Sequence, residues 1–314
     1  MKRSIRYESL PVKTLLNPVK APSMPFDWSV NPYRGCQHGC AFCYARATHA
    51  FLGAETDDTF QNHIFTKDNG PEALHEQLRK AARSRKGLSG LGRIAIGTAT
   101  DPYQQVEAKA MLTRRCLEVL AEYNVPVSIT TRSPLILRDL DLLMRLPDVS
   151  VNLSIGTLRQ DVWRSFEPST PSPAKRVETL QRLADAHIST NVFIAPVLPY
   201  LTDDASDLRS LIEAIAGCKP DSVMTSVLRL STREVKMWFF RTLHERYPQL
   251  CETYARLYSG SAHAPEHYRE TLKRTVRLLL EEHGLSASGA QPRLPEAAAI
   301  AAALPEPAQQ LYLF

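Results

Sequence analysis

The chain has 314 residues, of which 44% are apolar and 23% charged, a composition that excludes a disordered or collagen-like protein. The formal net charge of +5 mildly favours a polyanion such as nucleic acid as partner, although many basic proteins share it. No apolar run approaches the roughly 20 residues that span a bilayer, and the N-terminal segment has charges but no apolar signal core. The sequence therefore predicts a cytoplasmic protein with no membrane partner.

A proline-containing segment comes first along the chain, and a regular alternation of strands and helices follows it. Residues 1–27 show no sustained period and predict a lead-in segment that wraps the domain. A short strand over 28–33 precedes a loop with three cysteines and a predicted helix over 44–53. Residues 61–67 also resemble a strand, but the pattern does not place it in a sheet. The remaining pairs of predicted strand and helix are 93–100 with 107–123, 125–131 with 139–145, 149–156 with 174–187, 190–197 with 204–217, and 222–230 with 233–246.

This alternation predicts an α/β fold with parallel strands. The strands are nearly continuous apolar runs, which is typical of parallel strands buried on both faces. Strands alternating with helices imply right-handed crossovers. Six such units over residues 28–246 suit a partial (βα)6 TIM-type barrel better than an open doubly wound sheet, although periodicity alone does not separate the two. The pattern then predicts a C-terminal helical extension over 247–284, a flexible linker over 285–309 and a short terminal motif over 310–314.

Polar residues gather just after the predicted strands. Thr98 to Asp101 follow the second strand and Thr130 to Arg132 the third. Ser154 ends the fourth strand, and Pro196 lies at the end of the fifth. Because the loops that follow parallel barrel strands share one face, where active sites are built, these residues are expected to lie together.

Three cysteines stand within eight residues of the first of these loops. Cys36, Cys40 and Cys43 can converge because Gly35 and Gly39 let the backbone turn inward without strain. In a reducing compartment such a group predicts a metal site rather than disulfides. Two metals compete. Zinc would take a fourth ligand from His38 or His49, whereas a 4Fe-4S cluster held by three cysteines would keep one iron open.

The motif Cys36-x3-Cys40-x2-Cys43, with Phe42 before the third cysteine and six strand units behind it, resembles the radical S-adenosylmethionine (SAM) superfamily. The strings "NPYRGCQHGCAFCYAR", "IGTATDPYQ" and "ITTRSPLILRDLDLL" are similar, more narrowly, to the branch related to spore photoproduct lyase. The resemblance covers about residues 28–230. It implies a 4Fe-4S cluster on the three cysteines, SAM chelated by the open iron, a 5′-deoxyadenosyl radical, and an electron donor such as flavodoxin or ferredoxin.

The same resemblance implies roles for residues at the strand ends. Members of the family place a Gly-Gly-Glu-like turn after the second strand to meet the amino group of SAM. Here that place holds residues 97–101, which leaves the role to backbone carbonyls, Thr98 or Asp101. Arg132 suits the carboxylate of SAM, Ser154 its ribose, and Pro196 its adenine. Spore photoproduct lyase also uses a further cysteine as a hydrogen donor, for which this sequence offers no obvious match.

The last five residues, "QLYLF", closely resemble the pentapeptide by which bacterial DNA polymerases and repair proteins bind the sliding clamp. Leu311, Leu313 and Phe314 would enter an apolar pocket and Gln310 would supply an amide. A tail that folds back onto its own barrel is the alternative reading. With the clamp, the sequence predicts a radical SAM enzyme that acts on DNA, plausibly on a damaged base. The alternatives are an enzyme that modifies RNA, protein or a small molecule, and a non-catalytic zinc or iron-sulfur DNA-binding protein.

Overall fold

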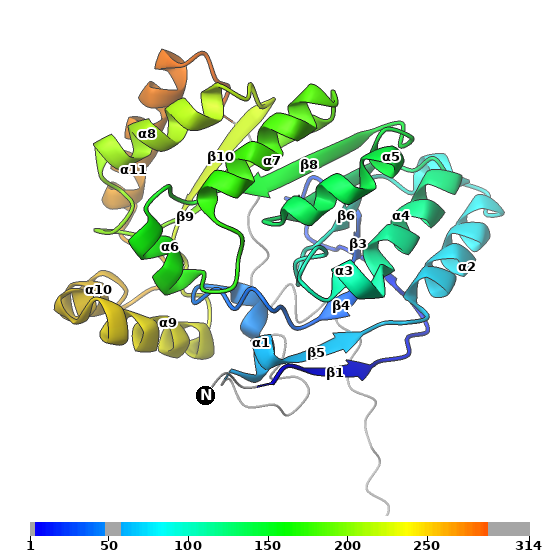
Figure 1. Ribbon diagram of the computed structural model, residues 1–314, viewed down its shortest axis with the longest axis horizontal. Helices are drawn as coiled ribbons and strands as arrows, with labels where there is room; N and C mark the ends of the chain where they lie inside the picture. Colours follow the sequence, from blue (N-terminus) through cyan, green and yellow to red (C-terminus); the bar gives the residue numbers. More distant parts are fainter. Residues whose placement is uncertain (1–3, 48–57, 288–314) are drawn as a thin grey trace, which may run out of the picture.

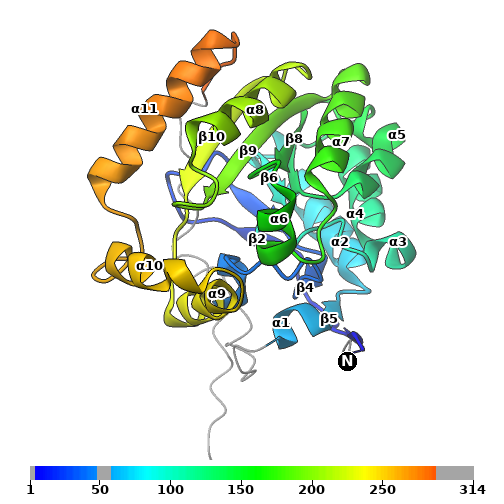
Figure 2. The ribbon, with the colours of Figure 1, turned by 60° about the vertical axis from the view of Figure 1, so that its left-hand side comes forward.

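Six parallel strands form the centre of the fold in the computed structural model, which describes residues 4–47 and 58–287. They pair in chain order, and each neighbouring pair is parallel. The sheet curves, and helices lie along its outer side (Figures 1 and 2). This arrangement confirms the predicted partial (βα)6 barrel. The six strands are β3 (Trp28–Val30), β6 (Ile94–Ile96), β7 (Val127–Thr131), β8 (Val149–Ser154), β9 (Ser189–Val197) and β10 (Ser222–Val227).

The helices of the barrel differ from the predicted ones mainly in where they begin and end. The segment predicted as one helix over 107–123 is split because Met111 adopts a left-handed backbone conformation with φ of 53°. The segment predicted over 139–145 is a 3-10 helix, Pro134–Asp139, that runs into a short α-helix. The helices up to the last barrel strand are α1 (Thr59–Asn62), α2 (Gly70–Ala82), α3 (Glu107–Ala110), α4 (Leu112–Glu122), α5 (Leu140–Leu143), α6 (Gln160–Phe166), α7 (Pro173–Asp185) and α8 (Ala205–Ala216).

The lead-in segment contributes two strands. β2 (Leu16–Pro18) pairs antiparallel with β3 and completes a seven-stranded sheet. β1 (Arg6–Ser9) pairs with β5 (His63–Thr66), which also pairs with β4 (Tyr33–Arg34). The strand-like stretch 61–67 therefore belongs to this separate three-stranded sheet beside the cysteine loop (Figure 1). Of the helix predicted over 44–53, residues 44–47 form a 3-10 turn and the rest lies outside the described residues.

The C-terminal part of the chain packs against two sides of the barrel. α9 (Arg233–Arg246) and α10 (Cys251–Leu257) share an aromatic cluster with the cysteine loop, in which Phe166, Phe239 and Tyr254 are buried. α11 (Glu266–Glu282) packs against α8 and β10 (Figure 2). None of the helices in the described ranges is long and apolar enough to cross a membrane. The predicted motif 310–314 and most of the predicted linker lie outside the described residues.

The barrel strands are apolar on their outer side and largely polar on their inner side. Alternate residues such as Ile129 and Val151 are fully buried in the core beneath the helices. The residues between them, such as Ser128 and Asn152, line a cavity inside the barrel. Successive side chains of a strand point to opposite faces of the sheet. The side chains on the outer face pack against helices, whereas those on the inner face border an open cavity, so the two faces of one strand differ in polarity. The sequence reading of strands apolar on both faces is wrong for the inner face.

Candidate functional site

The cysteine loop runs from the end of β4 to the 3-10 turn at residues 44–47, and tight turns shape it. Gly35 has φ of 82° and Gly39 has φ of 63°, both in the left-handed region. A Cβ atom on Gly35 would lie 2.7 Å from the carbonyl oxygen of His63, so no other residue fits there without a shift of the backbone. Cys36 and Cys40 are buried, and Cys43 is partly buried. The left-handed conformation of Gly35 and Gly39 therefore accounts for the predicted inward turn of the loop.

The loop after β6 holds the cysteine loop from one side. The carbonyl of Gly35 accepts hydrogen bonds from Thr100 Oγ1 at 2.6 Å and from Gln104 Nε2 at 3.2 Å. The Gln104 side chain also accepts a hydrogen bond from the backbone N–H of Gln37 at 2.9 Å. These buried bonds fix the position of the first cysteine relative to the second barrel strand.

Arg46 holds the same loop from the opposite side. Its guanidinium donates to the backbone carbonyls of Cys40, at 3.2 Å, and Gly39, at 3.1 Å. It also stacks on the rings of Trp238, 4.2 Å from the centroid, and Phe60, 5.2 Å from the centroid. Burial lowers the pKa of Arg46 to about 10, although the cysteine thiolates raise it. The side chain is therefore a buried cation at neutral pH, placed behind the three thiols.

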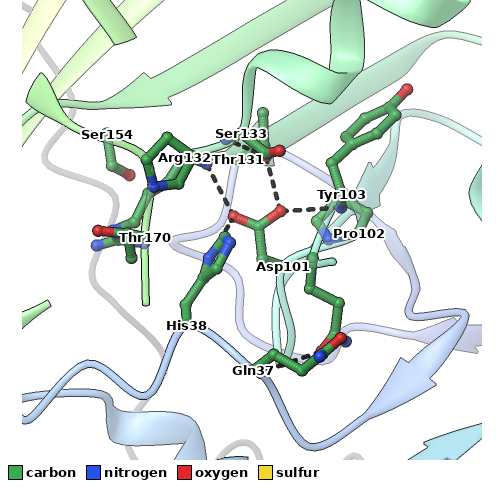
Figure 3. Close-up of polar contacts among 12 residues, drawn as sticks. Gln37, His38, Asp101, Pro102, Tyr103, Thr131, Arg132, Ser133, Ser154 and Thr170 are labelled. Atoms are coloured by element: carbon green, nitrogen blue, oxygen red, sulfur yellow. Dashed lines mark hydrogen bonds and ion pairs between the residues drawn. The ribbon is translucent and has the colours of Figure 1, made fainter. Parts of the chain in front are cut away.

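Asp101 is the centre of a buried network that joins the loop to the third strand (Figure 3). One carboxylate oxygen accepts from Thr131 Oγ1 at 2.7 Å and from the backbone N–H of Tyr103 at 2.9 Å. The other accepts from the backbone N–H of Arg132 at 2.8 Å and lies 3.2 Å from His38 Nδ1. Each oxygen therefore has two partners within the protein. This geometry makes Asp101 a residue that positions its neighbours.

The charge of this network extends to Cys36. Burial would lower the pKa of His38, but the Asp101 carboxylate and the Cys36 thiolate raise it to about 9. Burial would raise the pKa of Asp101, but the His38 imidazolium and the hydrogen bonds lower it to about 2. Burial alone would likewise raise the pKa of Cys36, but the adjacent imidazolium lowers it. The lowered pKa makes the thiolate of Cys36, the form that binds metal, easier to form than that of an ordinary cysteine.

Arg132 brings a second cation to the cavity wall. Its Nε lies 3.3 Å from Glu167 Oε2, and Glu167 also accepts from Arg176 Nη2 at 2.6 Å. Burial would lower the pKa of Arg132, but the Cys40 thiolate and the Glu167 carboxylate raise it. Arg132 therefore stays charged beside the thiols. Glu167 itself follows the last residue of α6 and pairs with both arginines.

A cavity of about 400 Å³ adjoins the three cysteines, His38, Asp101 and Arg132, whereas Arg46 and Glu167 do not line it. It begins at the cysteine loop and extends into the barrel. The eight residues that the sequence reading assigned to cluster and cofactor all line it: Cys36, Cys40, Cys43, Thr98, Asp101, Arg132, Ser154 and Pro196. Thr98 accepts a hydrogen bond from Asn31 at 2.9 Å, and its backbone carbonyl accepts one from the Tyr44 hydroxyl. The expected gathering of strand-end residues on one face is found.

Two functional residues were missed from the sequence or given another role. Arg46 received no role, although an arginine three residues after the last cysteine was the available signal. His38 was considered as a zinc ligand, whereas its Nδ1 faces Asp101. The other histidine considered, His49, lies outside the described residues.

Comparison with known proteins gives the family. The model of the radical SAM superfamily matches residues 30–213. An uncharacterized protein of Mycobacterium tuberculosis is 34% identical over 298 residues, which cover 93% of this chain and 85% of that protein. One from Methanocaldococcus jannaschii is 29% identical over 203 residues, 65% of this chain and 72% of that protein. A spore photoproduct lyase structure with bound AdoMet and dinucleoside spore photoproduct matches with a TM-score of 0.64 at 18% identity, over 90% of this chain and 80% of that one.

The chain belongs to the radical SAM superfamily and has the fold of spore photoproduct lyase. It is a radical SAM enzyme, and its cofactors are a 4Fe-4S cluster and SAM. The donor set fits this cluster, because three thiols stand on one buried loop at the cavity wall. Among residues 4–47 and 58–287, no three His, Cys, Asp or Glu side chains gather closely enough to hold a single metal ion. A 4Fe-4S cluster does not require the three cysteines to converge on a single ion, since each thiolate binds a different iron of the cluster.

Proposed function

We propose that Cys36, Cys40 and Cys43 hold the 4Fe-4S cluster and that the enzyme acts on a damaged base in DNA. When bound, the cluster and SAM supply a 5′-deoxyadenosyl radical that abstracts hydrogen from the substrate. The observation that carries the proposal is the group of three thiols at the wall of a cavity that opens into the barrel beside the half-buried cation Arg132.

The protein's own residues bind and orient the cofactors. Arg132 would pair with the carboxylate of SAM, and its charged guanidinium at the cavity wall supports this role. Ser154 and Pro196 line the same cavity, where the ribose and adenine of SAM would lie. The amino group falls to Thr98 or to a backbone carbonyl, since both oxygens of Asp101 already accept two hydrogen bonds. The loops around the cavity also exclude water from the reaction.

Three features support DNA as the substrate. The fold is that of spore photoproduct lyase, whose solved structure holds a dinucleoside lesion. The last five residues resemble the motif that binds the sliding clamp. Arg229 also lines the cavity, and a cation suits a phosphate backbone. A lesion buried in duplex would have to be flipped out to reach the cavity.

The decisive experiment measures 5′-deoxyadenosine release. Anaerobically reconstituted, reduced protein is given SAM with and without ultraviolet-irradiated DNA, beside a Cys40→Ala control. Release that requires Cys40 and rises with damaged DNA is expected. Release that requires Cys40 but is indifferent to DNA would retain the enzyme and transfer the substrate to RNA, protein or a small molecule. No release from protein with a full cluster would refute the radical mechanism, and zinc in place of iron would favour the non-catalytic alternative.

Two partners belong to the same proposal. The tail would bind the sliding clamp through Gln310, Leu311, Leu313 and Phe314. In a binding assay of the full chain with purified clamp, Leu313→Ala with Phe314→Ala should abolish binding, while Tyr312→Ala, at the variable position of the motif, should not. Equal binding by all three proteins would instead favour a tail that packs elsewhere. For the electron donor, flavodoxin or ferredoxin should each be tested as a replacement for the chemical reductant.

A further inference from the structure

A row of four uncharged polar side chains crosses the inner face of the barrel. In the sheet register Thr130 of β7 lies opposite Asn152 of β8, Asn152 opposite Asn191 of β9, and Asn191 opposite Ser222 of β10. The four residues, here called the polar row, are joined by hydrogen bonds. Asn152 Nδ2 donates to Thr130 at 3.2 Å, Asn191 Nδ2 to Asn152 at 3.1 Å, and Ser222 Oγ to Asn191 at 2.6 Å.

The polar row faces open space rather than a packed core. All four residues line the cavity that begins at the cysteine loop. In a closed barrel of this type, bulky branched side chains fill the interior. Here hydroxyl and amide groups take those positions and leave room for a ligand. The row is therefore a wall of the cavity, whereas the outward neighbours Ile129, Val151 and Val192 form the core.

The chemistry of this wall favours an uncharged ligand. The charged residues that line the cavity lie at its two ends, with Arg132 near the cysteine loop and Arg93 just before β6. Arg93 is already paired with Asp148 at 2.5 Å. Between these ends, the lining residues of β7 to β10 are serine, threonine, asparagine and apolar side chains. A charged group placed among them would lose its hydration without gaining a partner of opposite charge.

The polar row keeps donors and acceptors for a ligand. A primary amide has two N–H groups, and within the described part of the chain Asn191 uses one of them, toward Asn152. The Thr130 hydroxyl accepts from Asn152 and still has its own hydrogen to donate. The amide oxygen of Asn191 accepts one hydrogen bond and has a second lone pair. Alternating donors and acceptors of this kind match the edge of a nucleobase.

Two apolar side chains lie next to the polar row. Phe193 of β9 and Met224 of β10 are opposite each other in the register, and both line the cavity. An aromatic ring and a thioether are well suited to pack on the face of a planar ring. The cavity thus offers hydrogen bonds for the edge of such a ring and apolar contact for its face.

The deep end of the polar row lies beyond the cofactor site. Asn191 stands six positions before Val197, the last residue of β9, and Ser222 is the first residue of β10. Asn191 pairs with Asn152, which stands two residues before Ser154, the residue proposed for the ribose of SAM. At about 3.3 Å per residue, the row therefore crosses β8 and β9 roughly 7 Å deeper in the barrel than Ser154. Its deep end, Asn191 and Ser222, is available to a second molecule that lies next to SAM.

We propose that the polar row is the recognition site for the nucleobase of the substrate, with Asn191 and Ser222 contacting the edge of the base and Phe193 and Met224 packing on its face. This inference rests on the proposed function, since it takes a DNA base as the group that enters the barrel. It assigns substrate choice to residues that do not touch the cluster.

The test compares nucleoside binding by three forms of the reconstituted full chain in the presence of SAM. The Asn191→Leu, Ser222→Ala double variant removes both partners of one hydrogen bond, so neither is left unpaired. The matched control, Thr225→Val, changes a hydroxyl of β10 that has no hydrogen-bond partner in the described structure and does not line the cavity. The probes are the four deoxynucleosides, with deoxyribose as the molecule that lacks a base, and equilibrium dialysis measures retention.

At least one deoxynucleoside should bind more tightly than deoxyribose, the double variant should bind it at least tenfold more weakly, and the control should match the unmodified protein. SAM affinity should be equal in all three. Deoxynucleosides that bind no better than deoxyribose, or equally to the double variant, would overturn the proposal. A double variant that loses SAM instead would assign the row to the cofactor. Nucleoside binding without 5′-deoxyadenosine release would refute the proposed chemistry and keep the recognition site, whereas release without nucleoside binding would do the reverse.

Discussion

Replacing Asp101 by asparagine should destabilise the metal-free protein strongly, because the carboxylate accepts hydrogen bonds from the end of β7 and from its own loop and also contacts His38 of the cysteine loop. The new amide keeps one oxygen for Thr131 and Tyr103. Its NH₂ group then faces the backbone N–H of Arg132, which loses its acceptor. The contact with His38 loses its charge as well. A bond to a charged group contributes about 1.5–3 kcal/mol and an unsatisfied buried N–H costs about 1–3 kcal/mol, so a loss of about 3–5 kcal/mol is expected.

The assay is thermal unfolding of the metal-free protein followed by circular dichroism. For a domain of this size, that loss lowers Tm by about 6–15 °C. The control is Asp141→Asn, which changes an exposed carboxylate of α5 and should shift Tm by no more than about 2 °C. If Asp101→Asn unfolds within 2 °C of the unmodified protein, while SAM binding to the reconstituted enzyme is lost, Asp101 contacts the cofactor and does not position its neighbours as argued here.

Three further substitutions test other parts of the structure. Gly35→Ala should prevent the cysteine loop from closing, because its Cβ would meet two carbonyl oxygens within 3 Å. Gly39→Ala, whose Cβ would have no atom nearer than 3.5 Å, should cost only about 1 kcal/mol of folding stability. The iron content per chain after reconstitution distinguishes the two variants, and equal iron contents would contradict the steric argument. Glu107→Gln should lower the free energy of unfolding by about 3 kcal/mol in a urea titration, because the buried carboxylate accepts hydrogen bonds from Tyr33, Thr113, Arg114 and Arg138. The control Glu118→Gln changes an exposed carboxylate and should change the free energy of unfolding by less than about 0.5 kcal/mol. Equal effects of the two substitutions would refute a special role for burial. Arg46→Gln should lower the yield of assembled cluster and the Tm of the metal-free protein, because the carbonyls of Gly39 and Cys40 lose their hydrogen-bond donor. The control Arg241→Gln, which changes the other arginine stacked on Trp238, should change neither quantity. A full cluster in Arg46→Gln would show that the cysteine loop closes without the arginine.

Some features of the fold follow directly from the pattern of side chains along the chain. The alternation of β-branched strands with amphipathic helices specified six parallel units, since each element needs a neighbour to bury its apolar face. The cysteine spacing specified the metal loop, because three thiols with glycines between them are a local property. The positions of Thr98, Arg132 and Ser154 after successive strands were enough to predict one shared cavity, which the structure contains.

Other features depend on contacts between segments far apart in the sequence. The strand at 63–66 pairs with β1 and β4 in a separate sheet, because hydrogen-bond partners that lie about thirty residues away in β4 and nearly sixty residues away in β1 decide its place. Local periodicity does not record such partners. The short helix breaks at Met111 and at residues 134–143 follow from tertiary packing that overrides local propensity.

The sequence by itself determined the family fold and the cysteine triplet, since both are written in local spacing. Only the tertiary structure decided what surrounds the triplet. The sequence offers Asp101, Thr98 and backbone carbonyls as candidates for the amino group of SAM, and it does not show that four donors from three segments of the chain face the oxygens of Asp101. The polar row on the inner wall of the barrel also cannot be predicted from the sequence. Asn152 and Asn191 are single polar residues within apolar runs, and they form a row only because the strand register brings them side by side. Register is set by the whole sheet, because the hydrophobic pattern of every strand must fit its neighbours at once.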